Sequence, residues 1–372
     1  MKAKKVLCIA LILGSWMLFG SLCRGKEDFR DADKGADEHS WEEIRIQEEI
    51  LEGVCADALM YFPEGSFASY KTSLKIFEPD TVCTLFWPED AEAEPVGEEI
   101  EEGDFSLIYQ GESLGATPGS LRYFRDAQAG YTLDILALGE EMGVTEEKEL
   151  DFMPLSEARK EMETFLAELG IGGEPVLACA YGVTAQEMKS SYEAMAEDVH
   201  FQGFYHSGKL EGYNFDEKDE GYYLEYTFLL DGLPLYNTDS PALQVNSGID
   251  TPLPARTMEA SCFITSRGFR FFDLSGAIEK KMEKGEEQEL ISYEKIRPSI
   301  EKEYGDVIFS DTFRLAKIWP EYLPLEDVAA GRRIEVVPVW CCKFDIKLAG
   351  EEEFREVNLA NRFHAFTGEE VP

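Results

Sequence analysis

The longest apolar segment of the chain lies at its N-terminus and runs from Val6 to Leu22 without a charged residue. Three lysines within the first five residues come directly before it. A short basic region followed by an apolar run is the pattern of a secretory signal. Because about 17–20 apolar residues also suffice to cross a bilayer, a retained membrane anchor fits the same pattern. We therefore interpret residues 1–23 as a signal peptide or anchor.

The polar residues after the leader predict a linker and a short helix within residues 24–53. Ser40 and Glu43 stand three positions apart, which is the spacing of a helix-capping box. Residues 54–150 instead contain short β-prone runs bounded by turn residues, and Val82–Trp87 is one of them. These runs predict a mostly β N-terminal domain.

Two later segments have the apolar period of an amphipathic helix, and strand-like runs follow each of them. In residues 154–170 and again in residues 290–305, the apolar positions fall on one helical face. Pro298 predicts a kink in the second helix or a later start. We therefore predict an α+β fold in which two helix-plus-antiparallel-sheet units, residues 151–275 and 285–372, follow the mostly β domain.

Four short motifs in these two units suggest a known family. They are Leu155-Ser156 with its helix, Leu230-Asp231-Gly232-Leu233-Pro234, Val337-Pro338-Val339-Trp340 and Phe366-Thr367-Gly368-Glu369. The order of these four motifs along the chain resembles that in the PepSY-like modules of exported Gram-positive proteins. It also resembles the YycH/YycI type of membrane-anchored accessory protein. The resemblance covers residues 154–372 only. It implies helices packed on small antiparallel sheets and binding or inhibition through surfaces, and it supplies no catalytic residue.

Cys23 ends the apolar leader and is followed by polar chain, as is the lipid-modified cysteine of a bacterial lipoprotein. Leu22 fits the peptidase of that class poorly. Lipidation at Cys23, cleavage near Cys23–Gly25 and retention as an anchor helix are therefore three alternatives, and burial as a helix of the globular fold is a fourth. The first three place the bulk of the chain outside, at the extracytoplasmic face of the cell membrane or secreted.

The charge balance narrows the choice of partners. The chain has 372 residues, a net charge of −39 and 44% hydrophobic residues, so it can bury a sizeable core. Nucleic-acid binding needs clustered Lys and Arg, which this composition makes very unfavourable. Adhesion to anionic lipid is disfavoured for the same reason. Contact with a membrane is therefore expected through the N-terminal anchor only.

The sequence contains no motif that would indicate catalysis. A His-Glu-x-x-His helix and a complete phosphate-binding Gly-x-x-x-x-Gly-Lys-Ser/Thr loop are absent from it. Gly111-Glu112-Ser113-Leu114-Gly115 matches a Gly-x-Ser-x-Gly elbow in its letters, but it stands between β-prone runs and lacks the helical pattern that follows the serine of such an elbow. The chain has four histidines, and His200 and His206 would need a third ligand from elsewhere to hold a metal. We therefore predict no catalytic residue, no metal site and no cofactor.

Aromatic residues give the one indication of a binding surface. Several of them cluster around glycines between residues 201 and 223. Such rings serve either as core packing or as a surface for a peptide or glycan. The candidate surface residues are Phe204, Tyr205, Tyr213, Tyr222 and Trp340.

These observations favour an exported, envelope-tethered and non-enzymatic binding or regulatory protein that acts on another envelope protein or peptide. The alternative is a secreted carboxylate-dependent hydrolase of wall or dietary polymer, which would need a cleft holding two carboxylates with raised pKa values. A lipoprotein that captures a solute or a metal is the third hypothesis.

The leader interpretation gives a first prediction. Cell fractionation should recover the protein on the outer side of the membrane or in the medium, because the apolar leader directs translocation. Recovery of the intact, leader-bearing chain dissolved in the cytosol would contradict it.

Overall fold

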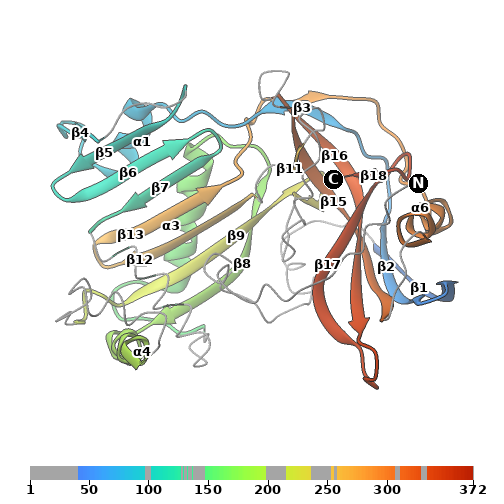
Figure 1. Cartoon of the computed structure of the whole chain (residues 1–372). Coiled ribbons are helices and arrows are strands. Elements are labelled where there is room, and N and C mark those ends of the chain that lie inside the picture. The colour runs from blue at the N-terminus through green and yellow to red at the C-terminus, as the bar shows by residue number, and fades with distance from the viewer. Residues whose placement is uncertain are drawn as a thin grey trace, which may run out of the picture.

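The computed structural model describes residues 41–96, 102–126, 147–197, 215–235, 253–254, 258–305, 311–327 and 333–371, together with Ala129, Thr132 and Leu136. Over these residues the chain forms two large β-sheets and four helices (Figure 1). The leader and Cys23 lie outside the described residues.

The first sheet combines strands from both ends of the chain, and we call it the terminal sheet. Its main order is β1-β2-β15-β16-β17-β18, and β3, β11 and β14 pair at its sides. All described pairings in it are antiparallel except β2 with β15. Its strands are β1 (Trp41–Leu51), β2 (Val54–Pro63), β3 (Tyr70–Ser73), β11 (Leu253–Pro254), β14 (Glu283–Lys284), β15 (Thr312–Asp327), β16 (Arg333–Lys347), β17 (Arg355–His364) and β18 (Glu370–Val371).

The second sheet is built from the middle of the chain, and we call it the central sheet. Its order is β10-β9-β12-β13-β7-β6-β5-β4, and β8 pairs with β9. All its pairings are antiparallel. Its strands are β4 (Glu94–Pro95), β5 (Phe105–Tyr109), β6 (Glu112–Thr117), β7 (Ser120–Phe124), β8 (Glu174–Val183), β9 (Gly221–Leu230), β10 (Leu233–Pro234), β12 (Glu259–Thr265) and β13 (Gly268–Ser275).

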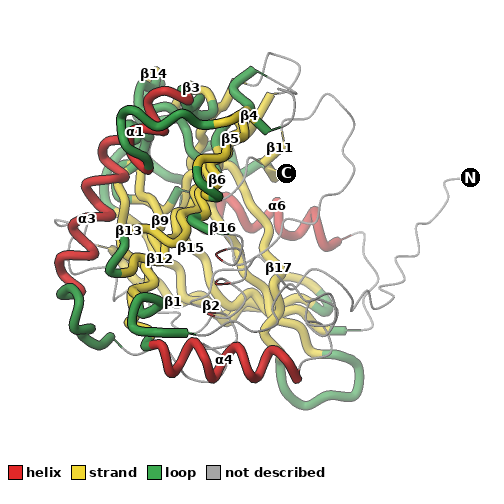
Figure 2. The backbone as a smooth tube through the Cα atoms, turned by 90° about the vertical axis from the view of Figure 1, so that its left-hand side faces the viewer, coloured by secondary structure: helices red, strands yellow, loops and turns green. Residues whose placement is uncertain are grey.

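Each sheet buries one face against a helix. α3 (Leu155–Glu168) packs on the central sheet, where its Phe165 ring lies 4.9 Å from that of Phe272. α1 (Pro79–Phe86) joins it through Phe86, and Figure 2 shows both helices along the same side of the strands. α6 (Tyr293–Gly305) covers the terminal sheet, and its Tyr304 ring lies 5.0 Å from Phe344. α4 (Ala185–Glu197) follows β8.

The predicted fold class is wrong. The two sheets and the small share of helix make a mostly β protein, instead of two helix-plus-sheet units after a separate β domain. The β-prone strands of residues 54–150 do not form a sheet of their own: β2 and β3 join the terminal sheet, and β5–β7 join the central sheet. Local periodicity identifies elements but not their distant pairing partners, and these partners decide the architecture.

Two predicted elements also change type. The helix expected before residue 53 is the strand β1, whose Ile46 and Ile50 are buried. The run Val82–Trp87, expected as a strand, lies largely in α1, which begins at Pro79. Proline at the first turn of a helix is a start signal, and here it outweighs the β-prone residues that follow. The amphipathic patterns at α3 and α6 did predict helices, and α6 accommodates Pro298.

A tight turn links the two sheets. Asp231 and Gly232 join β9 to β10 with φ angles of 47° and 75°, the left-handed values that a two-residue hairpin turn requires. The Asp231 carboxylate accepts hydrogen bonds from the Tyr70 hydroxyl at 2.5 Å and the Tyr322 hydroxyl at 3.1 Å, and both tyrosines belong to the terminal sheet. Burial, helped by the hydrogen bond to Asp231, raises the pKa of Tyr70 to about 12.

Replacing Asp231 tests this link. We expect Asp231→Ala to lower the free energy of unfolding by about 1–2 kcal/mol, because two tyrosine hydroxyls lose a charged acceptor at a partly solvated site. Asp231→Asn is the matched control, since asparagine tolerates the left-handed turn and keeps an acceptor, so it should cost less. Chemical denaturation measures both. Asp231→Ala should cost less stability in a Tyr70→Phe/Tyr322→Phe double variant, which lacks both hydrogen bonds. An equal cost in that variant and in the wild type would contradict the role of the hydrogen bonds.

Candidate functional site

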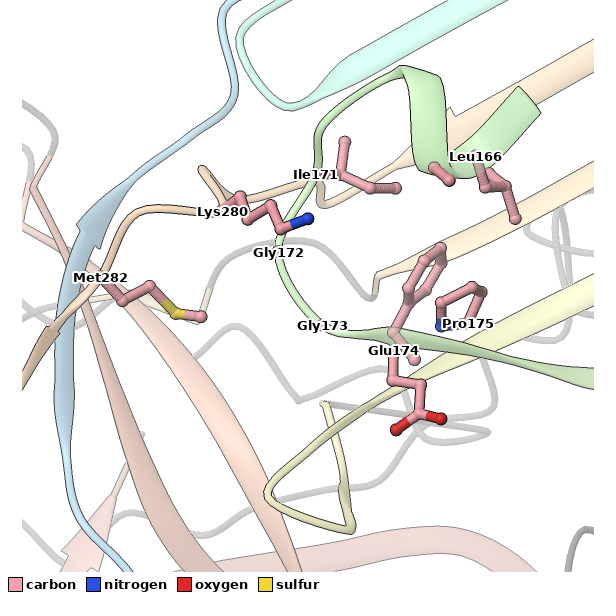
Figure 3. A pocket seen from close by; sticks show the side chains of 10 residues that line it. Leu166, Ile171, Gly172, Gly173, Glu174, Pro175, Lys280 and Met282 are labelled. Carbon is pink, nitrogen blue, oxygen red and sulfur yellow. The ribbon is translucent and has the colours of Figure 1, made fainter. Parts of the chain in front are cut away.

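A pocket of about 330 Å³ opens where the two sheets meet (Figure 3), and we call it the junction pocket. Three segments build it: the last turn of α3 with the loop into β8, one residue of β9, and the segment that leaves β13 for β14. Its lining residues are Leu166, Ala167, Ile171, Gly172, Gly173, Glu174, Pro175, Phe228, Lys280 and Met282.

Glycines let these segments approach one another. Gly172 donates its N–H to the carbonyl of Ile278 at 2.8 Å, so the loop lies directly against the crossing segment. A Cβ at Gly172 would meet the Glu279 carbonyl oxygen and the Ile278 side chain at 3.0 Å. Gly173 has a φ of 80°, which side-chain-bearing residues rarely adopt. The pocket therefore depends on the glycine-rich stretch between α3 and β8.

The walls are apolar and the rim is charged. Leu166 and Phe228 are 2% and 1% exposed, and Met282 is half-buried. Lys280 is exposed at the rim, and Figure 3 shows its ammonium group turned toward the pocket while the Glu174 carboxylate points away from it. No hydrogen bond or ion pair joins Lys280 to any part of the chain that the structure describes. The pocket thus offers an apolar space beside one positive charge.

A second pocket of about 360 Å³ lies on the face of the central sheet across β5, β6, β7 and β13. Small residues such as Ser113 and Gly115 line this face. Its charged groups are Arg122 and Asp273, which already form an ion pair at 2.6 Å. Because these charges compensate each other, the junction pocket is the better candidate site.

The structure corrects part of the predicted aromatic surface. Tyr222 and Trp340 are 0% exposed. The Tyr222 hydroxyl donates to the carbonyl of Met153 at 2.8 Å, and the Trp340 indole donates to that of Ile291 at 3.0 Å. Both are core residues of their sheets, so their prediction as surface residues is wrong. Phe204, Tyr205 and Tyr213 lie outside the described residues.

Sequence reasoning missed the junction pocket. Its one local signal is Gly170-Ile171-Gly172-Gly173, three glycines within four residues directly after a helix. The density of glycine indicated that two backbones approach closely there.

The hydrolase alternative required two carboxylates in one cleft. Among its lining residues the junction pocket has a single carboxylate, Glu174, and the second pocket has Asp273. Two carboxylates do interact elsewhere: Glu303 on α6 raises the pKa of Glu370 on β18. Both residues are exposed, and neither lines either pocket.

Within the described ranges, no group of three or more His, Cys, Asp or Glu side chains is arranged to hold a metal ion. The thiols of Cys55, Cys83, Cys262, Cys341 and Cys342 are free. None of the described helices combines the length and the apolar character that crossing a bilayer demands.

Comparisons with known proteins give a fold but no function. No protein-family model matches the chain, and no curated protein matches it. Among solved structures, the chain is similar to the crystal structure of an uncharacterised protein from Eubacterium rectale, with a TM-score of 0.50 and 13% sequence identity. The match covers 89% of this chain and 95% of the other. At this identity the likeness concerns the fold alone.

The carboxylate pair predicts a pH dependence of stability. Although the Glu370 side chain is exposed overall, partial desolvation of its carboxyl group, hydrogen bonding with Glu303 and the charge of that neighbour raise its pKa to about 7, from an ordinary value of 4.5. A carboxyl that binds its proton more tightly in the folded state stabilises the fold at low pH. Its contribution should therefore be complete below pH 4.5 and be lost as the pH rises through about 7.

Chemical denaturation at pH 5 and pH 8 checks this expectation. Glu370→Gln keeps a neutral partner for Glu303, so the variant should gain stability relative to the wild type at pH 8 and little at pH 5. Glu353→Gln, in the exposed turn before β17, is the control. The same difference from the wild type at both pH values would refute the assignment to Glu370.

Proposed function

We propose that this protein is an exported, non-enzymatic binding protein of the cell envelope that holds an apolar group of another envelope protein or peptide in the junction pocket. The observation that supports it is the open, apolar-walled pocket beside Lys280. Export and tethering rest on the basic, apolar leader of residues 1–23.

The chemistry of the lining favours binding over reaction. Leu166, Ile171, Phe228 and Met282 offer carbon and sulfur surface, which gains free energy by removing an apolar group from water, at about 25 cal/mol per Å². Binding pockets typically join such walls to a small number of polar groups that fix orientation. Lys280 fits that orienting role.

The geometry also favours side-chain capture over the addition of a peptide strand. β8 borders the pocket and pairs, within the described chain, with β9. Pro175 removes one backbone donor from β8, and the register shifts between Leu177 and Cys179. Proline and bulges are two devices that keep an edge strand from accepting a further strand. The pocket at the start of β8 is therefore the stronger contact point.

A pocket-filling variant tests the proposal. Ala167 is exposed on α3 and lines the pocket, so Ala167→Trp should occupy the space without disturbing the core. We expect it to weaken binding of fluorescein-labelled tripeptides Ser-Ala-Phe and Ser-Ala-Leu at least tenfold, measured by fluorescence anisotropy. Thr164→Trp, on the same helix but outside the pocket, should leave binding unchanged.

The peptide Ser-Ala-Ser is the ligand control, because it replaces the large apolar C-terminal side chain by a small polar one. It should bind much more weakly than the other two. Absence of binding by both apolar peptides, or equal binding to wild type and Ala167→Trp, would overturn the proposed function.

A further inference from the structure

We infer that the junction pocket recognises the C-terminal residue of a peptide chain, with the apolar side chain inside the pocket and the terminal carboxylate at Lys280. This inference rests on the proposed function and names the ligand of the same site. Its basis is the coincidence of one unpaired cation, apolar walls and a side-chain-free stretch of backbone.

Among the charged residues that line the pocket, Lys280 is the cation, and its ammonium group faces the pocket (Figure 3). The neighbouring carboxylate, Glu279, is bound to Lys75, whose Nζ lies 3.2 Å from Oε2, and it also accepts the N–H of Ile76. Lys280 itself has no ion-pair partner in the described structure. An anionic group of a ligand would form an ion pair with Lys280.

The walls limit the size of the apolar part. A volume of about 330 Å³ lies at the lower end of the range for ligand pockets, so it suits one side chain with its end group better than a long acyl chain. Phe228 and Leu166 provide fixed walls because they are buried. Met282 is unbranched and polarizable, and such side chains adapt to ligands of differing shape. Leucine, methionine and phenylalanine side chains all match this space.

The glycine stretch admits a peptide backbone. Gly172 and Gly173 line the pocket without side chains, so a ligand's main chain can approach the protein's own. An internal peptide segment would carry no charge on its backbone. A C-terminal residue places a carboxylate two bonds from its Cβ, and capture of this end group is an established mode of peptide recognition. The single positive charge at the rim matches the single negative charge of that end group.

A peptide acid and the matching peptide amide distinguish the contribution of the carboxylate to binding from that of the side chain. Fluorescein-Ser-Ala-Phe with a free C-terminus and the same peptide with a C-terminal amide differ only in the end group. We expect the acid to bind the wild-type protein about tenfold more tightly, since a charge-assisted hydrogen bond at a solvated rim contributes at that scale. Fluorescence anisotropy at low salt measures both affinities.

Two lysine variants identify the partner of the carboxylate. Lys280→Met keeps the apolar stem and removes the charge. It should therefore weaken binding of the acid peptide about tenfold and leave binding of the amide peptide unchanged. Lys281→Met removes an adjacent exposed charge that does not line the pocket, and the preference for the acid should survive it.

The outcomes distinguish the inference from the proposed function. Equal binding of acid and amide, with both weakened by Ala167→Trp, would overturn carboxylate recognition and leave the apolar pocket in place. A preference for the acid that Lys280→Met and Lys281→Met reduce equally would reveal general charge attraction and would also overturn it. If neither peptide bound, carboxylate recognition and the proposed function would both be overturned.

Discussion

The architecture depends on one parallel pairing between distant parts of the chain. β2 lies beside β15, with Val54 opposite Phe313 and Met60 opposite Ile318. Parallel strands require a long connection between them, and here that connection contains the entire central sheet. The terminal sheet can therefore close only after the last third of the chain is available. Non-local pairing of this kind makes folding slow, because the chain entropy of a large loop is lost before the contacts form.

The two segments that cross between the sheets stabilise each other. The N–H of Lys75, where the chain leaves the terminal sheet, donates to the carbonyl of Ala277, where the chain returns, at 2.9 Å. The N–H of Glu279 donates back to the carbonyl of Ser73 at 3.0 Å. The loop after α3 packs against the returning segment through Gly172. The junction pocket is consequently a property of the connection between the sheets, and its ligand would contact elements that no single sheet contains.

The sequence predicted elements whose structure depends on one short stretch of chain. It did not predict features that depend on contacts between distant segments. The apolar period at Leu155–Glu168 predicts α3 because the helix and its buried face share one stretch of chain. Tyr222 and Trp340 were assigned to a surface because ring-rich strands have the same composition whether they face a partner or a helix. The pocket could not be assembled from sequence, since Leu166, Phe228 and Lys280 meet only through the tertiary fold.

The strand β1 has a consequence for the behaviour of the protein at high concentration. Among the described strands it is an outer strand of the terminal sheet, and edges of this kind can offer unpaired backbone groups to a neighbour. Glu42, Glu43 and Glu49 are exposed along it. Two copies that aligned these edges would bring like charges to within a strand spacing of about 4.8 Å. Because glutamates outnumber the one arginine, Arg45, on this strand, electrostatic repulsion would oppose edge-to-edge pairing between copies.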